Sequence, residues 1–225
     1  MKRLVVVRPL PGALRTVEAA SAQGLVAVAM PVQEYEPVEW HMPRGDFDGL
    51  LVGSAMAFAF PSAMLDETRH LPVHAVGATT AAAAECSGYR VASTGVGGLQ
   101  AVIDALPADK HHRLLRIGGE ERVPLDLAEH VNVVEAAAYR LVDIELTAED
   151  AGVLGKDAVV ALHSAGAARS FRRNCERLDI SLPSISLACL GPRIASAAGE
   201  GWACVESADS PNDAALLALA CTMCQ

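Results

Sequence analysis

The stretch that decides the fold is DGLLVGSA at residues 48–55, because it recurs as DAVVALHSA at residues 157–165. Each copy is an apolar run that ends in a serine. A continuous apolar run is typical of a parallel strand that is buried on both faces. A serine after such a run is typical of the residue that caps a helix. The stretch therefore predicts a strand followed by a helix, in two copies.

Two further pairs of segments repeat with nearly the same spacing. Residues 3–7 resemble residues 113–117, and residues 71–77 resemble residues 185–191. These matches predict two related half-chains of about 110 residues each. Apolar strands alternate with helical segments throughout, which is typical of parallel sheets covered by helices on both faces. The expected fold class is therefore α/β, with two similar doubly wound parallel-sheet (flavodoxin-like) lobes.

The ends of the expected elements follow from the apolar periodicity and from local signals. Gly24 and Gly88 mark helix ends, because glycine adopts the left-handed conformation there without strain. Thr147 followed by Asp150 resembles a capping box at a helix start. The expected strands are residues 4–7, 50–52, 73–76, 89–92, 113–117, 159–162, 185–190 and 203–206. The expected helices are residues 12–23, 55–65, 79–86, 99–106, 124–130, 169–177, 194–198 and 213–223.

Two extended segments, residues 31–38 and 133–142, interrupt this alternation. The second is longer than an ordinary buried strand, which suits a strand that leaves one sheet and crosses to another lobe. Each segment lies where one repeat hands over to the other. Together they predict a two-stranded hinge between the lobes.

The composition limits the classes of function. The chain has 225 residues, of which 52% are hydrophobic and 20% charged, with a formal net charge of −9. The apolar content can supply a core, whereas the negative charge excludes a general nucleic-acid binder, which needs a basic face. The longest uncharged stretch, residues 49–65, is shorter than the ~20 residues of a membrane helix and contains Pro61. We expect a soluble, cytoplasmic protein that binds neither nucleic acid nor membrane.

Motifs for metals, nucleotides and hydrolytic nucleophiles are missing from the sequence. Cys221 and Cys224 have no second ligand pair and are expected to pack as helix thiols, and His111 and His112 would point to opposite faces of a strand. Residues 94–98 are glycine-rich but lack dinucleotide-loop spacing, so we interpret them as a flexible loop. Neither a phosphate loop nor a nucleophile elbow occurs. We expect no cofactor and no metal.

Small polar residues recur where a strand ends and a helix begins. They are Ser54, Gly77 with Thr79, Ser164 and Gly191. In open α/β sheets, ligands bind beyond the carboxyl ends of the strands, where N–H groups at helix starts attract anions. Such residues also serve simply as helix caps. The pattern leaves two interpretations open: a site for several carboxylates, or a set of caps.

Several short motifs, taken in order, resemble the uroporphyrinogen-III synthase family over essentially the whole chain. They are Val7-Arg8-Pro9, residues 48–55, residues 75–81, Tyr139 at the end of the long crossover strand, residues 160–171 and residues 190–192. The resemblance implies a discontinuous first lobe, residues 1–34 and 143–225, and an inserted second lobe, residues 37–138. It also implies cyclisation of linear hydroxymethylbilane to uroporphyrinogen III, with loss of water and inversion of the last pyrrole ring, and without a cofactor.

The resemblance also implies roles for individual residues. Tyr139 would orient or protonate the departing hydroxyl as the catalytic residue. The residues that would bind the acetate and propionate arms of the substrate are Arg8, Ser54, Ala55, Gly77, Thr79, Ser164, Ala165, Gly191 and Arg193. The chain departs from the family pattern at five positions. Val7 and Gly53 stand where threonine is usual, and His163 takes the place in the second copy that matches Gly53. Arg193 and Ile194 replace small hydroxyl residues.

The implied partner is a small-molecule polycarboxylate tetrapyrrole, and we expect a monomer. The alternative from another class is a non-catalytic two-lobed protein that binds a small anion or regulates another process. Such a protein would need the same cleft but not Tyr139. A nucleotide-using α/β enzyme is disfavoured because the phosphate loop is missing.

Overall fold

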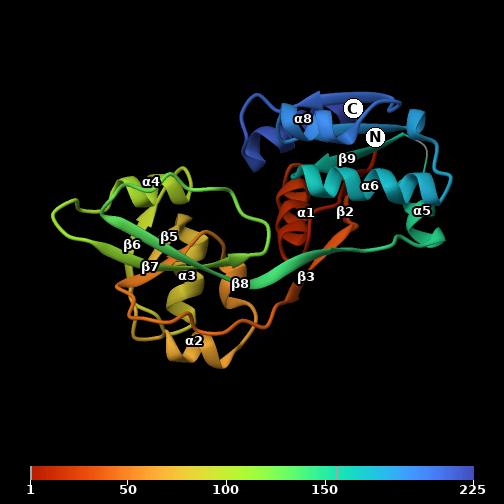
Figure 1. The fold of residues 1–225 in the computed structure, drawn as a ribbon. Helices are drawn as coiled ribbons and strands as arrows, with labels where there is room; N and C mark the ends of the chain where they lie inside the picture. The colour runs from red at the N-terminus through yellow and green to blue at the C-terminus, as the bar shows by residue number, and fades with distance from the viewer. Residues whose placement is uncertain (1, 156) are drawn as a thin grey trace. The chain divides into compact units, whose positions relative to one another are not determined.

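The computed structural model describes residues 2–155 and 157–225 and has a mixed α/β structure with parallel sheets (Figure 1). The chain divides into two compact units. Unit 1 consists of Met1–Tyr35 and Val142–Gln225, and unit 2 consists of Glu36–Leu141. Each unit has hydrophobic cores built from its own residues alone.

Unit 1 contains a five-stranded sheet in the order β11-β10-β9-β1-β2, with all neighbours parallel. Helices cover both faces, which is why its central strands are apolar throughout. Leu4 and Val6 lie in a core with residues of α1 and α8, whereas Val5 lies in a core with residues of α6 and α7. The strands are β1 (Leu4–Val6), β2 (Ala27–Ala29), β9 (Ala158–Leu162), β10 (Ile185–Cys189) and β11 (Cys204–Ser207). The helices are α1 (Gly12–Ala22), α5 (Ala148–Leu154), α6 (Ala165–Arg177), the 3₁₀ helix η2 (Leu182–Ser184), α7 (Pro192–Ala198) and α8 (Asp213–Cys224).

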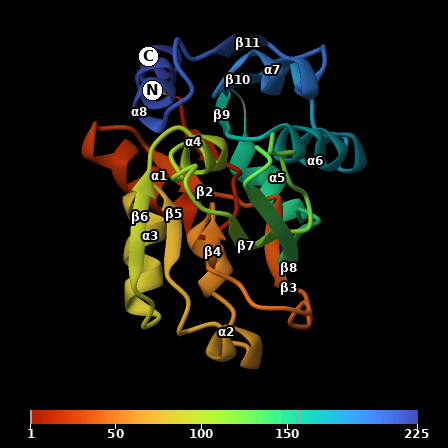
Figure 2. The ribbon, with the colours of Figure 1, turned by 60° about the vertical axis from the view of Figure 1, so that its left-hand side comes forward.

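Unit 2 is built on a six-stranded sheet in the order β3-β8-β7-β4-β5-β6, and Figure 2 shows β6, β5, β4, β7 and β8 in succession. The neighbours from β8 to β6 are parallel. Leu50 and Val52 lie in a core with residues of α2 and α3, whereas Leu51 lies in a core with residues of α4. The strands are β3 (Gln33–Pro37), β4 (Gly49–Val52), β5 (Val73–Val76), β6 (Val91–Gly95), β7 (His112–Gly119) and β8 (Val131–Asp143). The helices are the 3₁₀ helix η1 (Ala55–Phe58), α2 (Ala63–Glu67), α3 (Gly77–Cys86) and α4 (Leu99–Asp104).

The strands β3 and β8 each contain a boundary between the units. The N–H of Val38 donates to the carbonyl of Ala138, and the N–H of Ile144 donates to the carbonyl of Val32, both at 2.9 Å. The residue number rises along one partner as it falls along the other, so the two strands run antiparallel. Strand β3 lies inside the predicted crossover segment 31–38, and the predicted segment 133–142 lies inside β8.

The strands that the sequence repeat matches occupy equivalent places in the two sheets. In unit 1 the order β2-β1-β9-β10-β11 corresponds to β8-β7-β4-β5-β6 in unit 2. The matched segments at residues 3–7 and 113–117 contribute β1 and β7, which pair with β9 and β4 respectively. The repeated stretch at residues 48–55 and 157–165 therefore supplies β4 and β9, the strands beside β7 and β1.

Two predicted helices are wrong. In place of one helix over residues 55–65 the chain forms η1 and α2, with Pro61 between them. The Ser62 hydroxyl accepts the N–H of Leu65 at 3.3 Å and begins a new helix there. Residues 124–130 form no helix, because the Gln100 side chain bonds both the N–H of Asp126 at 2.9 Å and its carbonyl at 2.8 Å. The short strand β2 was not predicted.

Several local signals are confirmed. Gly24 and Gly88 have φ of +82° and +83° just after α1 and α3. Thr147 and Asp150 form the predicted capping box at the start of α5. Cys221 and Cys224 both lie in α8, as free thiols. Within the described ranges, no helix has the length and apolar character needed to span a bilayer.

Candidate functional site

Five predicted binding residues gather at one edge of the sheet in unit 1. Strands β1, β9 and β10 are parallel neighbours, so their carboxyl ends meet at the same edge. Arg8 follows β1, Ser164 and Ala165 follow β9, and Gly191 and Arg193 follow β10. This is the edge at which open α/β sheets bind ligands.

A cavity of about 330 Å³ lies at this edge. Three predicted residues line it: Ala165, Gly191 and Arg193, which is exposed. The other lining residues are Leu190, Pro192, Ile194 and Pro211. The cavity is thus mainly apolar with one guanidinium, which suits a ligand that has both an apolar body and a carboxylate.

Ser164 acts as the N-cap of α6. Its hydroxyl oxygen accepts the N–H of Ala167 at 3.1 Å. A hydroxyl that accepts one hydrogen bond still has its own hydrogen to donate. Capping therefore accounts for Ser164 without excluding a contact with a ligand.

Arg8 is not an open guanidinium but part of a cluster. Its Nη1 lies 3.0 Å from Oδ2 of Asp213, in the first turn of α8, and 3.5 Å from the hydroxyl of Thr16. The other carboxylate oxygen of Asp213 lies 3.7 Å from Nε2 of His163. Burial and then the charge of Arg8 lower the pKa of His163 to about 4, although Asp213 acts in the opposite direction. Sequence reasoning assigned no role to Asp213 and treated His163 only as a departure from the family pattern.

In unit 2 the carboxyl ends of β4 and β5 carry four predicted residues: Ser54, Ala55, Gly77 and Thr79. Ser54 caps η1, where its hydroxyl accepts the N–H of Met56 at 3.2 Å. Gly77 has φ of +74° and begins α3, so Thr79 lies inside the first turn of the helix and is exposed. The interpretation of Thr79 as a helix cap is therefore wrong, because α3 starts two residues earlier than predicted.

Tyr139 lies at the same edge of unit 2. It is opposite Gly119, the last residue of β7, and Ile117 of β7 is opposite Val52 of β4. Ser54 follows the end of β4, and Tyr139 lies near the end of its pairing with β7, so both residues belong to the same edge of the sheet. The prediction that Tyr139 ends its strand is wrong, because β8 continues to Asp143.

The Tyr139 side chain is half-buried against the core and against Gly119. A Cβ atom placed on Gly119 would lie 3.0 Å from Cε2 of Tyr139 and 3.4 Å from Cζ. Gly119 therefore leaves the space that this orientation of the ring needs.

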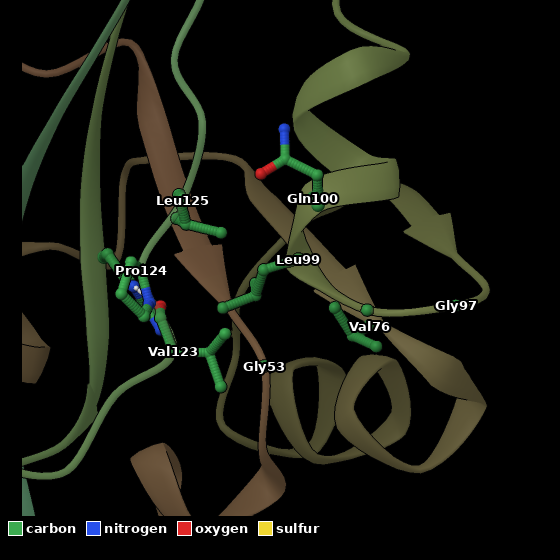
Figure 3. Close-up of a pocket in the computed structure, with 10 residues that line it drawn as sticks. Gly53, Val76, Gly97, Leu99, Gln100, Val123, Pro124 and Leu125 are labelled. Carbon is green, nitrogen blue, oxygen red and sulfur yellow. Dashed lines mark hydrogen bonds between the residues drawn. The ribbon is translucent and has the colours of Figure 1, made fainter.

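A second cavity, of about 300 Å³, lies beside this edge of unit 2 and contains none of the predicted binding residues (Figure 3). Figure 3 shows the side chains of Leu99, Val123 and Leu125 at its walls, and Gly97 and Gly98 form part of its rim. Both glycines have positive φ, +95° and +109°. Of the stretch interpreted as a flexible loop, residues 94–95 belong instead to the end of β6, and Gly97 and Gly98 line the cavity.

A charged network around the buried Arg116 adjoins that cavity and was not predicted. Arg116 is buried and donates to Oε1 of Glu135 at 2.8 Å and to the carbonyl of Val123 at 3.0 Å. Arg122 binds the other carboxylate oxygen of Glu135 at 2.8 Å. These contacts hold residues 119–123 against the sheet, so the structure assigns them a structural role.

Each edge offers N–H groups and hydroxyls that bind carboxylates; unit 1 adds guanidinium groups and unit 2 adds one phenol. Among the described residues no group of three His, Cys, Asp or Glu side chains is placed to hold a metal ion. The residues present suit recognition of a carboxylate-bearing molecule and proton donation from a phenol.

The chain is similar to one family of known proteins. The sequence model of the family described as uroporphyrinogen-III synthase HemD matches residues 15–218. The crystal structure of the uroporphyrinogen-III synthetase of Helicobacter pylori is similar with a TM-score of 0.68 and 17% identity, over 99% of this chain and 100% of that one. A Thermus thermophilus uroporphyrinogen III synthase structure matches with a TM-score of 0.43 and 16% identity, over 100% of both chains. No curated protein matches.

Proposed function

Because the chain belongs to the uroporphyrinogen-III synthase family, it is a lyase of tetrapyrrole biosynthesis that cyclises hydroxymethylbilane, and we propose that its two sheet edges hold the carboxylates of that substrate. The match over residues 15–218 carries the activity. The gathering of the predicted residues at the carboxyl edges of both sheets supports the proposed site. Uroporphyrinogen III and water are the products of the reaction.

The proposed organisation is two flavodoxin-like lobes. The first comprises residues 1–34 and 143–225 and the second residues 37–138, with residues 31–38 and 133–142 as a two-stranded hinge. Support comes from the order of the strands in the sheets. In unit 1, when the strands are numbered along the chain, the order is 2-1-3-4-5, as in flavodoxin. In unit 2 the same order results when β7 and β8 are numbered first and second and β4, β5 and β6 follow them. The antiparallel strands β3 and β8, which contain the unit boundaries, support the hinge.

The enzyme's main task is control of geometry. Loss of the terminal hydroxyl as water leaves an azafulvene-like cation. Ring closure at the substituted carbon of the last pyrrole gives a spiro intermediate, which fragments and recloses in the inverted sense. Because the same substrate closes without enzyme to the uninverted isomer, the protein must hold the flexible chain in one arrangement. Orientation of this kind is worth up to ~7–11 kcal/mol in favourable intramolecular reactions.

The acetate and propionate arms bind at the two edges. N–H groups at the starts of α6 and α3 attract anions through the positive ends of these helices. Arg8 and Arg193 add charge-assisted contacts in unit 1, and their positive charge offsets locally the net charge of −9. Ser54 and Ser164 keep their capping bonds and donate their hydroxyl hydrogens outward. Ala55, Gly77, Ala165 and Gly191 contribute backbone N–H groups beside them.

Tyr139 orients or protonates the departing hydroxyl. Its place beside Gly119, at the carboxyl edge of the sheet, supports this role. A phenol is a weak acid, so we expect a modest contribution to the rate, within the ~10²–10⁴-fold range of general acids.

Isomer analysis tests the function. Purified protein is incubated with freshly made hydroxymethylbilane, and the type I and type III products are separated after oxidation. We expect mainly type III from the native chain, and a lower rate with unchanged product affinity from Tyr139→Phe. Product that is mainly type I, with the native chain present in excess, contradicts the assignment. A Tyr139→Phe variant with an unchanged rate would contradict the catalytic role of Tyr139 and leave the activity of the chain in place.

A monomeric state and a cytoplasmic location remain part of the proposal. Light scattering of the purified chain measures the first directly, and a molar mass near 23.5 kDa is the expected result.

A further inference from the structure

Three side chains meet at the carboxyl edge of unit 1. Arg8 comes from the end of β1, His163 from the end of β9 and Asp213 from the start of α8. Asp213 lies between the other two, 3.0 Å from Nη1 of Arg8 and 3.7 Å from Nε2 of His163. The cluster thus contains a cation, an anion and a group that can gain a proton.

The imidazole of His163 is buried without a satisfactory partner. Its side chain is only 6% exposed, and neither ring nitrogen has a hydrogen-bond partner within the described part of the chain. A neutral imidazole has one donor and one acceptor. Only weak interactions reach the ring here, with the Asp213 carboxylate at 3.7 Å and with the backbone of Ala161. A buried polar group without partners costs stability and calls for an explanation.

The groups around His163 have opposite effects on its pKa. Burial and the charge of Arg8 keep the ring neutral, whereas the Asp213 carboxylate and the backbone of Ala161 favour the protonated ring. The N-terminus of α6, which begins two residues later, adds a further positive end. Whether His163 is protonated therefore depends on whether the positive charge of Arg8 is neutralised by another group.

The ion pair of Arg8 and Asp213 is accessible to solvent. Their side chains are 28% and 54% exposed, so a carboxylate from solution can reach the guanidinium. Exposed ion pairs are weak and exchange readily with competing ions. Asp213 thus occupies the place on Arg8 that a ligand carboxylate would take.

We propose that Arg8, Asp213 and His163 form a proton-linked receptor in which a substrate carboxylate displaces Asp213 from Arg8 and Asp213 then pairs with a protonated His163. The proton comes from solvent, and no covalent bond changes. This inference rests on the proposed function, because it takes Arg8 as a contact for a substrate carboxylate. His163 acts as a positioning residue, since it touches Asp213 rather than the substrate.

The direction of the pH dependence follows from the charges. Once a ligand carboxylate neutralises Arg8, one influence that lowers the pKa of His163 is removed and the influence of Asp213 remains, so the pKa rises above about 4. Binding then takes up a proton. The substrate binds more tightly as the pH falls through the raised pKa and loses this gain at higher pH.

A first experiment needs no substrate. The imidazole of His163 is titrated by NMR in the native chain, in Arg8→Gln and in Asp213→Asn, and its signal is assigned by loss in His163→Gln. We expect a higher pKa in Arg8→Gln and a lower one in Asp213→Asn. An unchanged His163 titration in Arg8→Gln overturns the proposal, whether or not the enzyme makes uroporphyrinogen III.

A second experiment measures KM for hydroxymethylbilane between about pH 5 and about pH 8, where the substrate carboxylates are largely ionised. In the native chain we expect KM to fall several-fold toward the lower pH, and in His163→Gln we expect it to stay nearly constant. His112→Gln is the matched control, because His112 is also buried but bonds the carbonyl of Pro107 at 2.9 Å. It should keep the native dependence. Equal slopes in His163→Gln and the native chain overturn the proposal, whereas mainly type I product would contradict the proposed function instead.

Discussion

Gly119 controls the position of the proposed catalytic phenol. Replacing it with alanine adds a Cβ that would lie 3.0 Å from Cε2 of Tyr139, so the ring must move by a few tenths of an ångström. We predict that Gly119→Ala lowers kcat several-fold, well short of the ~100-fold that a 1 Å misplacement can cost. The added methyl restricts the unfolded chain, so stability should change by less than about 1 kcal/mol. Steady-state kinetics and urea unfolding measure the two effects.

The neighbouring Gly118 is the matched control, because a Cβ there meets nothing within 4 Å. Gly118→Ala should keep the native kcat, and equal kcat values in the two variants would contradict the role given to Tyr139. Sequence alone located Tyr139 through a family motif but not Gly119 as the residue opposite it. It also missed the pairing of Arg8 with Asp213, because local patterns carry no information on contacts 205 positions apart.

Variants at the N-cap of α6 distinguish the two roles left open for Ser164, which are capping of the helix and contact with the substrate. Ser164→Ala removes the acceptor for the N–H of Ala167 and should lower the free energy of unfolding by about 1 kcal/mol. Ser164→Asp keeps the cap and suits the helix dipole, so stability should stay close to native. If substrate carboxylates bind at this helix start, the added negative charge should nevertheless raise KM about tenfold.

Ser62 provides the control for this pair of variants, since it caps α2 in the same way, away from the predicted site residues. Ser62→Asp should leave both stability and KM near native, and an unchanged KM in Ser164→Asp would leave Ser164 as a cap only.

At this scale the sequence was most reliable where the signal is local, as with the capping box of Thr147. It failed at residues 55–65 and 124–130, where Pro61 and the side chain of Gln100 override the apolar periodicity.

The duplication of the strand order was predictable at the scale of the molecule. The repeated apolar runs supply equivalent strands in both sheets, since each run must be buried on two faces to be stable. The partition into units depends instead on which strands pair, and apolar runs of similar composition do not specify their neighbours. A resemblance to a family supplied what the periodicity could not.

The separate cores predict that the two units unfold independently. Every described core cluster contains residues of one unit alone, so loss of packing in one need not weaken the other. The chain has two tryptophans, of which Trp202 lies in a core of unit 1 and Trp40 packs against a core of unit 2. Variants that keep only one of them report each unit by fluorescence during urea unfolding.

Leu162→Ala and Leu115→Ala each empty a fully buried site and should cost ~2–5 kcal/mol in unit 1 and unit 2 respectively. We expect the first to shift only the Trp202 transition and the second only that of Trp40, and a joint shift in either variant would mean that the units unfold as one.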